Sequence, residues 1–237
     1  TELSDLADAA LEGALAIARH EVDGSEHVRF AIIGMGKLGA QELNYVSDVD
    51  LIYVVEPADM DTNGMALSRI GTKMATTLQR GCQSVIMGVA EPTLWQIDGG
   101  LRPEGKDGPL VRRLESHEAY YEQWAENWEF QALLKARPVA GDTDLGQAYM
   151  DMTRPFVWTA SKRDNFVYDC QQMRKRVEDL IPNPLKDREI KLGRGGLRDV
   201  EFTVQMLQLV HGRSDEALRT SSTLCLLYTS DAADDRI

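Results

Sequence analysis

Two aspartates separated by a single residue, Asp48 and Asp50, precede an apolar segment of this 237-residue chain. Side chains two residues apart on a strand point to the same side of a sheet, so both carboxylates are expected to lie together. Neighbouring carboxylates repel each other unless a cation lies between them. Hard oxygen ligands with room for water and phosphate suit Mg²⁺. The pair therefore predicts a magnesium site.

A glycine-rich turn lies between this pair and a preceding apolar segment, and it reads GMGKLG over residues 34–39. Glycine turns at helix N-termini bind phosphate through their backbone N–H groups. We expect Gly36, Lys37 and Ser47 to hold phosphate oxygens, although a lysine in such a turn is often only a surface charge. A metal clamp beside a phosphate-binding turn is the layout of a phosphoryl or nucleotidyl transfer site.

The same glycines also match the dinucleotide-binding fingerprint, with Glu56 about 20 residues downstream in the place of the ribose-binding acid. The spacing argues against that alternative. A parallel crossover needs a dozen or more residues, whereas only about ten separate Gly39 from the next strand at Val49. An antiparallel or hairpin-like return is therefore expected. An isolated Asp-x-Asp pair can also be an ordinary solvated strand edge.

The longer pattern GMGKLGAQELNYVSDVDL over residues 34–51 resembles the nucleotidyltransferase domains of the bifunctional glutamine synthetase adenylyltransferase/deadenylylase family. The resemblance continues through Leu101-Arg102-Pro103 and Trp128-Glu129 to KLGRGGLRDVEF over residues 191–202, and it covers roughly residues 28–224. It implies that Asp48, Asp50 and Asp98 hold the catalytic metals. One residue differs, because Ile97 stands where the family commonly has valine.

Enzymes of this family carry two related halves with opposed activities. The segment 191–202 resembles the N-terminal half, and so does Asn44. The resemblance thus implies Mg²⁺-dependent phosphorolysis, in which orthophosphate removes AMP from a tyrosine of glutamine synthetase as ADP. Two alternatives stay open: ATP-dependent adenylylation by the same acids, and a non-catalytic module that binds glutamine synthetase or a PII-type signal protein. Intact acids at all three positions argue against the module.

The bulk composition points to a cytoplasmic protein with a proper core. The net charge of −12 makes a nucleic-acid partner unexpected. No apolar run approaches the roughly 18 residues of a membrane span, and no signal-peptide pattern opens the chain. Three widely spaced cysteines show neither a zinc spacing nor a disulfide framework. Any phosphate site must therefore be built locally, from Mg²⁺ and a few placed cations.

Strands must position the acids, and hydrophobic patterning predicts them over residues 28–33, 49–55 and 93–98. The third strand ends on Asp98, and three carboxylates from neighbouring strands can surround two metal ions. Amphipathic helices are expected to cover the sheet. Their predicted spans are Leu3–Val22 with Ser4 as N-cap, Met65–Arg80, and one long helix Ser116–Ala136.

Further cations are expected to bind phosphate. Arg102 lies in the glycine- and proline-rich loop 99–111, where a bidentate guanidinium suits phosphate oxygens. Arg194 and Arg198 belong to KLGRGGLR, whose glycines and cations at a helix N-terminus predict an anion site. The helices expected in this half span 144–152, 155–160, 163–180 and 197–210, the last with Val200, Val204, Leu207 and Val210 inward.

The expected fold class is α+β. Residues 1–137 are predicted to form a nucleotidyltransferase fold with a small mixed sheet and flanking helices. Residues 138–224 are predicted to form a helical bundle packed against the active-site side. Residues 225–237 begin CLLYTSDAAD, which resembles a translated transposase adapter, so this tail is expected to be non-native.

Overall fold

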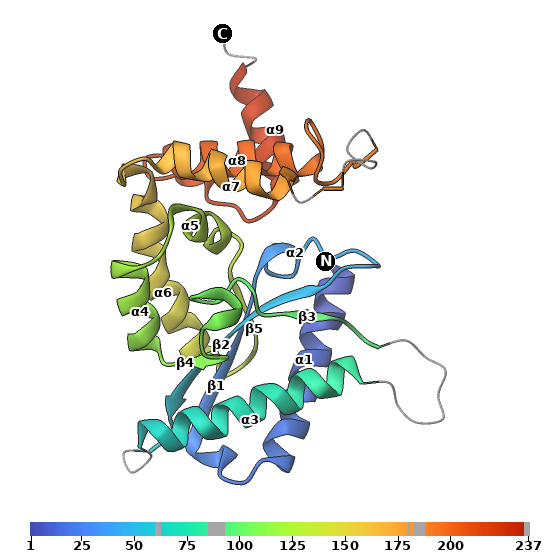
Figure 1. The fold of residues 1–237 in the computed structure, drawn as a ribbon, viewed down its shortest axis with the longest axis vertical. Helices are drawn as coiled ribbons and strands as arrows, with labels where there is room; N and C mark the ends of the chain where they lie inside the picture. The colour runs from blue at the N-terminus through green and yellow to red at the C-terminus, as the bar shows by residue number, and fades with distance from the viewer. Residues whose placement is uncertain (60–62, 85–92, 180, 183–187, 235–237) are drawn as a thin grey trace. The chain divides into compact units, whose positions relative to one another are not determined.

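The computed structural model describes residues 1–59, 63–84, 93–179, 181–182 and 188–234 (Figure 1). The chain forms two compact units. Unit 1 comprises Thr1–Trp124 and Lys135–Thr153, and unit 2 comprises Ala125–Leu134 and Arg154–Ile237. The domain boundary expected between residues 137 and 138 lies inside strand β5 (Arg137–Gly141), which pairs with a strand of unit 1. Strand pairing thus keeps residues 135–153 with unit 1.

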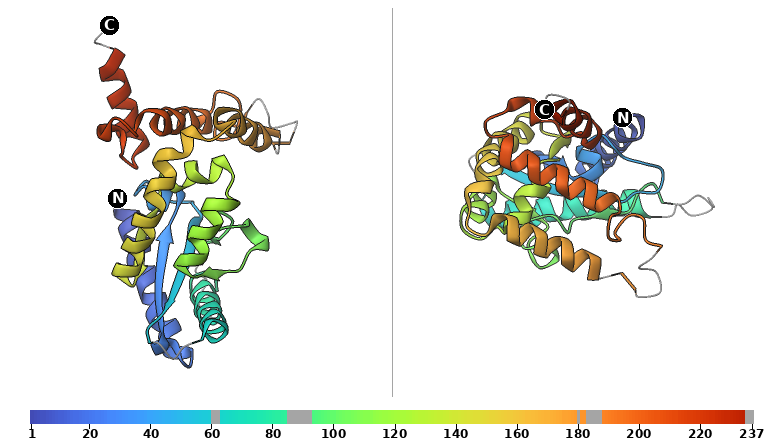
Figure 2. Two further views of the ribbon diagram at one scale, coloured as in Figure 1. Left: turned by 90° about the vertical axis from the view of Figure 1, so that its left-hand side faces the viewer. Right: turned by 90° about the horizontal axis from the view of Figure 1, so that it is seen from above.

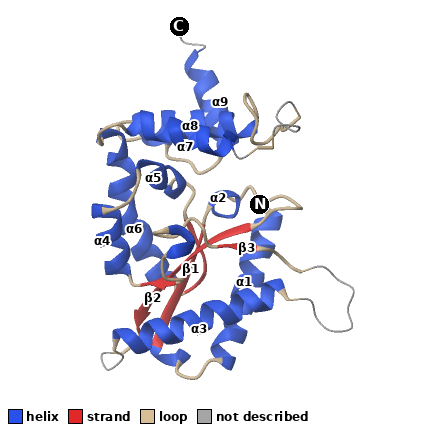
Figure 3. Ribbon diagram, viewed as in Figure 1, coloured by secondary structure: helices blue, strands red, loops and turns tan. Residues whose placement is uncertain are grey.

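Unit 1 contains the small mixed sheet that the sequence predicted (Figure 3). Its order is β3-β2-β1-β5, and β4 also pairs with β2. Strand β1 is antiparallel to β2 and β5, whereas β2 is parallel to β3 and β4. The strands other than β5 span Val28–Gly34 (β1), Val49–Pro57 (β2), Ile97–Asp98 (β3) and Val111–Arg112 (β4).

The antiparallel pairing of β1 with β2 excludes the dinucleotide-binding fold. The register runs from Gly34 opposite Leu51 to Val28 opposite Pro57, whereas that fold needs parallel strands joined by a crossover helix. The connection holds only the single-turn helix α2 (Gly36–Gly39). Glu56 serves another purpose: its carboxylate accepts a hydrogen bond from the Leu114 N–H at 3.0 Å, at the start of the next helix.

Side chains on both faces of β1 and β2 are buried, because helices lie on both sides of the strands (Figure 2, left). On one face Phe30 and Tyr53 join a core with helices α1 (Glu2–Glu21) and α3 (Gly64–Gln83). On the other face lie helices α4 and α6, with bounds Leu114–Gln123 and Thr143–Thr159. Within the described residues, no helix is both long and apolar enough to cross a membrane.

Two details near the first helix and the third strand differ from expectation. The N-cap of α1 is Thr1, and Ser4 is buried, with its Oγ accepting a hydrogen bond from the Leu43 N–H at 3.2 Å. Ser4 therefore ties α1 to the loop before β2 instead of capping the helix. The strand expected over 93–98 is paired only at Ile97–Asp98.

The single helix expected over Ser116–Ala136 is wrong. Helix α4 ends at Gln123, and α5 (Asn127–Leu133) begins anew after Glu126. The break follows from a capping box: the Glu126 side chain accepts from the N3 backbone, while the Glu129 carboxylate accepts the Glu126 N–H at 2.9 Å. These bonds satisfy N–H groups that a continuous helix would have used internally.

Helix α6 continues through Pro155, although the sequence predicted two separate segments. Proline removes one N–H donor and disfavours a helix interior. Here Tyr149, Thr153 and Val157 are all buried along the helix, so packing on both sides of the proline maintains the helix.

The described part of unit 2 contains helices joined by turns, with α5 in contact with α7 (Phe166–Asp179) and α8 (Leu197–His211). Gln131 of α5 donates to the Gln205 Oε1 of α8 at 2.8 Å. Leu180, the last residue of the helix expected over 163–180, lies outside the described residues. Helix α9 (Thr223–Asp234) includes most of the tail that resembles an adapter, of which residues 235–237 are likewise not described.

The inward face expected for α8 is mostly wrong. Val204 is buried, but Val200, Leu207 and Val210 are 41–49% exposed. Two glutamines take their place in the interior, and Gln208 donates to the carbonyls of Leu218 and Thr220 at 2.6 and 2.7 Å. Amide side chains can be buried on this face because backbone carbonyls satisfy them, which an apolar pattern does not reveal.

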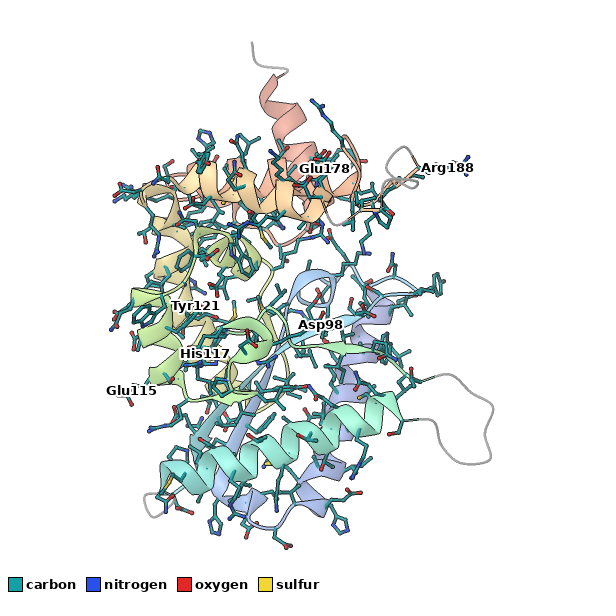
Figure 4. The ribbon with its side chains drawn as sticks, in the orientation of Figure 1. Asp98, Glu115, His117, Tyr121, Glu178 and Arg188 are labelled. Carbon is teal, nitrogen blue, oxygen red and sulfur yellow. The ribbon has the colours of Figure 1, made fainter. Side chains whose placement is uncertain are left out.

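A buried histidine lies where α4 packs in unit 1. The His117 ring stacks on Tyr121 at 6.1 Å and meets the edge of Tyr149 at 5.2 Å, and the two tyrosine hydroxyls are 2.8 Å apart. Figure 4 shows His117 and Tyr121 on the same helix. Burial, assisted by the positive charge of Arg112, lowers the pKa of His117 to about 3. The ring is therefore neutral at physiological pH.

We expect the free energy of unfolding to fall between pH 6 and pH 4, in part because of His117. The unfolded histidine takes up a proton near pH 6.5, whereas the folded ring stays neutral to about pH 3. Stability that is complete above pH 6.5 is therefore lost as the pH falls, by about 1.4 kcal/mol per pH unit for one such group. Urea unfolding at a series of pH values measures the free energy of unfolding. For His117→Phe this free energy should fall less steeply with decreasing pH than in the wild type. His20→Phe, at an exposed position, should keep the pH dependence of the wild type. Equal slopes in all three proteins would contradict this assignment.

Candidate functional site

Asp50 and Asp98 are neighbours across two parallel strands. In the pairing of β2 with β3, Val49 lies opposite Ile97 and Asp50 lies opposite Asp98. The Val49 N–H donates to the Gln96 carbonyl at 2.9 Å, which fixes this register. Adjacent strands are about 4.8 Å apart, so the two acids lie side by side as the sequence predicted. Figure 4 labels Asp98 at the end of β3.

Asp48 lies one residue before β2 and is exposed, and the preceding Ser47 is partly buried. Among the residues that the structure describes, no three His, Cys, Asp or Glu side chains are grouped closely enough to hold a metal ion. The structure therefore pairs Asp50 with Asp98 but does not gather Asp48 into a three-carboxylate cluster. The Mg²⁺ site stays a prediction.

The glycine turn lies directly against Asp50. Gly36 has φ +51°, and a Cβ added there would lie 2.5 Å from the Asp50 Oδ2. The Met35 N–H donates to the Asp50 carbonyl at 2.8 Å, which holds the turn to the start of β2. A carboxylate packed on a glycine backbone beside a second carboxylate fits a hard cation shared with a phosphate on the turn. The donor set is therefore suited to Mg²⁺.

Replacing Gly36 by alanine is expected to weaken metal binding more than stability. The added Cβ would displace the Asp50 carboxylate, and the left-handed φ adds about 1 kcal/mol of strain. Titration with Mn²⁺, followed by its electron paramagnetic resonance signal, should show weaker binding in Gly36→Ala. Gly64→Ala is the matched control, because among the described residues outside its own helical turn no heavy atom lies within 4 Å of the new Cβ. Unchanged Mn²⁺ affinity in Gly36→Ala would show that the turn does not position Asp50.

Asp98 is held by the loop that follows it. The Gly100 N–H donates to the Asp98 Oδ1 at 2.7 Å. The Arg102 guanidinium closes this loop, because Nη1 donates to the Gly99 carbonyl at 2.7 Å and Nη2 to those of Lys106 and Gly108, both at 3.1 Å. Arg102 thus organises the loop beside Asp98. Its expected contact with phosphate stays a prediction.

Lys37 and Arg137, two cations beside the glycine turn, have different hydrogen-bond partners. Lys37 Nζ lies 3.3 Å from the Asn44 Oδ1, across the loop between α2 and β2. Arg137 donates to the carbonyls of Leu38 and Gly39 at the end of α2 and forms a bidentate pair with Asp8 at 2.7 and 3.1 Å. No local pattern could reveal this pair, since its members are 129 residues apart.

The KLGRGGLR turn belongs to unit 2, whereas the other predicted site residues belong to unit 1. Arg194 is exposed, and Arg198 pairs with Glu201 at 3.4 Å. The Asp199 carboxylate accepts the Gly195 N–H at 2.5 Å and also pairs with Arg174. Hydrogen bonding from Arg174 lowers the pKa of Asp199. The turn thus binds an anionic group of its own chain, and its expected contact with phosphate stays a prediction.

Comparison with known proteins identifies two matching family models. The model described as glutamate-ammonia ligase adenylyltransferase matches residues 1–152. The model described as GlnD PII-uridylyltransferase matches residues 170–234. The first match covers the sheet, the glycine turn and all three predicted metal ligands.

Similar full-length proteins carry the name bifunctional glutamine synthetase adenylyltransferase/adenylyl-removing enzyme. The one from Bifidobacterium longum strain DJO10A is 86% identical over 223 residues, which are 94% of this chain and 21% of that protein. Those from Cutibacterium acnes and Streptomyces avermitilis are 53% and 55% identical, over 100% and 94% of this chain and 24% and 22% of their own lengths.

The chain thus spans about a fifth of the length of the relatives it matches. Their name covers two opposed activities, so the likeness does not assign this chain to either one. The family itself is clear, because a single family model covers more than half of the chain. This chain belongs to the glutamate-ammonia ligase adenylyltransferase family.

Proposed function

We propose that this chain is the nucleotidyltransferase part of an enzyme that removes AMP from an adenylylated tyrosine of glutamine synthetase by phosphorolysis. The observation that carries the proposal is the pairing of Asp50 with Asp98, with the Gly36 turn packed on the Asp50 carboxylate. The names of the relatives support glutamine synthetase as the substrate, since each name includes glutamine synthetase and an adenylyl-removing enzyme.

The acids would bind the metal, and the glycine turn would orient the phosphate. Asp48, Asp50 and Asp98 would hold Mg²⁺, which when bound neutralises negative charge on the transferred phosphate. The turn at Gly36 and Lys37, together with Ser47, would orient the phosphate oxygens. Further contacts to AMP phosphate or orthophosphate are assigned to Arg102, Arg194 and Arg198.

The reaction needs no general base. An orthophosphate oxygen forms a bond to the AMP phosphorus, the bond from phosphorus to the tyrosyl oxygen breaks, and ADP leaves. The tyrosyl oxygen keeps the electron pair and takes a proton from water, since the pKa of tyrosine is about 10. Orthophosphate is already an anion, so it attacks without losing a proton to the protein.

The proposed direction of the reaction, removal of AMP instead of its addition, depends on the resemblance of two short segments to one half of the family. Asn44 and the segment 191–202 resemble the deadenylylating half, whereas ATP-dependent adenylylation would use the same acids and is the second candidate. The match of residues 170–234 to a PII-uridylyltransferase model leads us to propose a PII-type signal protein as regulator. We propose that the reaction takes place in the cytoplasm, because orthophosphate, nucleotides and glutamine synthetase are all available there.

The test is an incubation of the chain with adenylylated glutamine synthetase, Mg²⁺ and orthophosphate, with ADP release measured by chromatography. ADP that requires orthophosphate supports phosphorolysis. AMP incorporated from ATP into unmodified glutamine synthetase, with no ADP release from the modified form, supports adenylylation instead. If neither reaction occurs while glutamine synthetase binds, the chain is a binding module and the proposal is wrong.

A further inference from the structure

Two adjacent apolar side chains beside the predicted metal ligands are almost fully exposed. Tyr45 and Val46, here called the rim, are 91% and 97% exposed. Exposed large apolar side chains are common singly, but contiguous ones next to a site mark contact surfaces. Tyrosine in particular is enriched at the centres of protein interfaces, because its ring offers a large contact area at a low entropic cost.

The exposure of the rim is built into the fold. On one side of the rim, Leu43 is buried and its N–H donates to the Ser4 Oγ at 3.2 Å. Asn44 Oδ1 lies 3.3 Å from Lys37 Nζ. On the other side, the Val49 N–H donates to the Gln96 carbonyl at 2.9 Å. The rim is thus a short exposed segment between two ends of the loop that hydrogen bonds hold in place.

The rim lies within reach of the site by chain geometry alone. Tyr45 precedes Asp48 by three residues, so their Cα atoms are at most roughly 11 Å apart. A second exposed apolar residue lies on the neighbouring segment: Leu94, 60% exposed, precedes Ile97 by three residues, just as Val46 precedes Val49. Since Val49 and Ile97 are register partners, both segments carry apolar side chains at the same end of the paired strands β2 and β3.

A protein substrate must cover this rim. A tyrosine side chain is shorter than the roughly 11 Å that can separate the Cα atoms of Tyr45 and Asp48. When the modified tyrosyl oxygen reaches Asp48 and Asp50, the backbone of the protein substrate therefore comes close to the rim. A free nucleotide has no such requirement. We propose that Tyr45 and Val46 dock the polypeptide that surrounds the target tyrosine and so select a protein substrate over small adenylyl esters. This inference rests on the proposed function and specifies how its substrate is recognised.

The experiment compares a protein substrate with a small one. Tyr45→Ser/Val46→Ser is assayed on adenylylated glutamine synthetase and on adenylyl-tyrosine amide, with saturating orthophosphate and Mg²⁺. We expect the KM for the protein to rise about tenfold or more, as for an interface hot spot, while kcat/KM for the amide stays within twofold. Tyr45→Phe should restore most of the affinity, since it keeps the ring.

Met65→Ser is the matched control, because Met65 is 84% exposed but follows the opposite end of β2. An unchanged KM for the protein in the rim variant would overturn the proposal. Equal losses on both substrates would also overturn it, because the ring would then serve the nucleotide, for example by stacking on adenine.

Failure of the proposed function gives a different pattern. If the wild-type chain processes neither substrate, the rim is judged by surface plasmon resonance on immobilised adenylylated glutamine synthetase. Weaker binding of the rim variant than of Met65→Ser then supports docking, and equal binding overturns it.

Discussion

Replacing Asp50 by asparagine is expected to reduce turnover about a thousandfold or more while leaving the protein as stable as before. Asparagine keeps the shape of the side chain against Gly36 but removes the charge that a divalent cation requires. Because asparagine also keeps the volume of the aspartate side chain, the melting temperature should change little. Initial rates of ADP formation and thermal unfolding measure the two effects. Mn²⁺ titration gives a readout independent of turnover.

The control for this substitution is Asp23→Asn, an exposed aspartate after α1. It changes the net charge by the same amount but lies outside the predicted metal and phosphate ligands, so its rate should be that of the wild type. Retention of more than a tenth of the activity by Asp50→Asn, with Mn²⁺ affinity unchanged, would exclude Asp50 as a ligand.

Gly39→Ala is expected to cause the largest loss of stability of any substitution considered. A Cβ at this position would lie 1.8 Å from the Lys135 carbonyl oxygen and 2.4 Å from that of Gly34. Both are backbone atoms of strands or their approaches, so neither can move without shifting β1 or the entry to β5. A cost of about 3 kcal/mol or more is typical when a clash has no flexible neighbour. Urea unfolding monitored by circular dichroism measures it.

Gly13→Ala is the same chemical change, but it is expected to increase the free energy of unfolding instead of lowering it. Gly13 lies in the interior of α1, and among the described residues outside its own helical turn no heavy atom lies within 4 Å of a Cβ added there. Alanine should therefore raise the free energy of unfolding by up to about 1 kcal/mol, because glycine loses more conformational freedom in a helix. If both variants unfolded at the same urea concentration as the wild type, the close approach of α2 to the Lys135 backbone would be wrong.

The strands of the site were predictable because their signals are local. An apolar run ending in glycines, and a second run opened by Asp48 and Asp50, determine where β1 and β2 form. The short connection between them excluded a parallel crossover, and the antiparallel register confirms this. The sequence predicted a third strand that ends on Asp98, whereas its position opposite Asp50 comes from the pairing of β2 with β3.

The helical boundaries were less predictable because the competing interactions differ by little energy. A capping box of Glu126 and Glu129 ends what looked like one long helix, and packing carries α6 through Pro155. Each of these outcomes depends on a few hydrogen bonds or contacts of about 1 kcal/mol. The spacing of apolar residues alone does not reveal energy differences of about 1 kcal/mol between alternative helix boundaries.

By itself, then, the sequence determined the mixed sheet, a strand ending on Asp98, and the family. Only the tertiary structure decided what the charged and polar side chains contact. Arg102 closes the loop beside Asp98, and Arg137 holds the end of α2 and Asp8. Asp199 occupies the glycine turn of unit 2. The physical reason is that strand formation depends on neighbours along the chain, whereas a side chain's hydrogen-bond partners are brought to it from distant positions by folding.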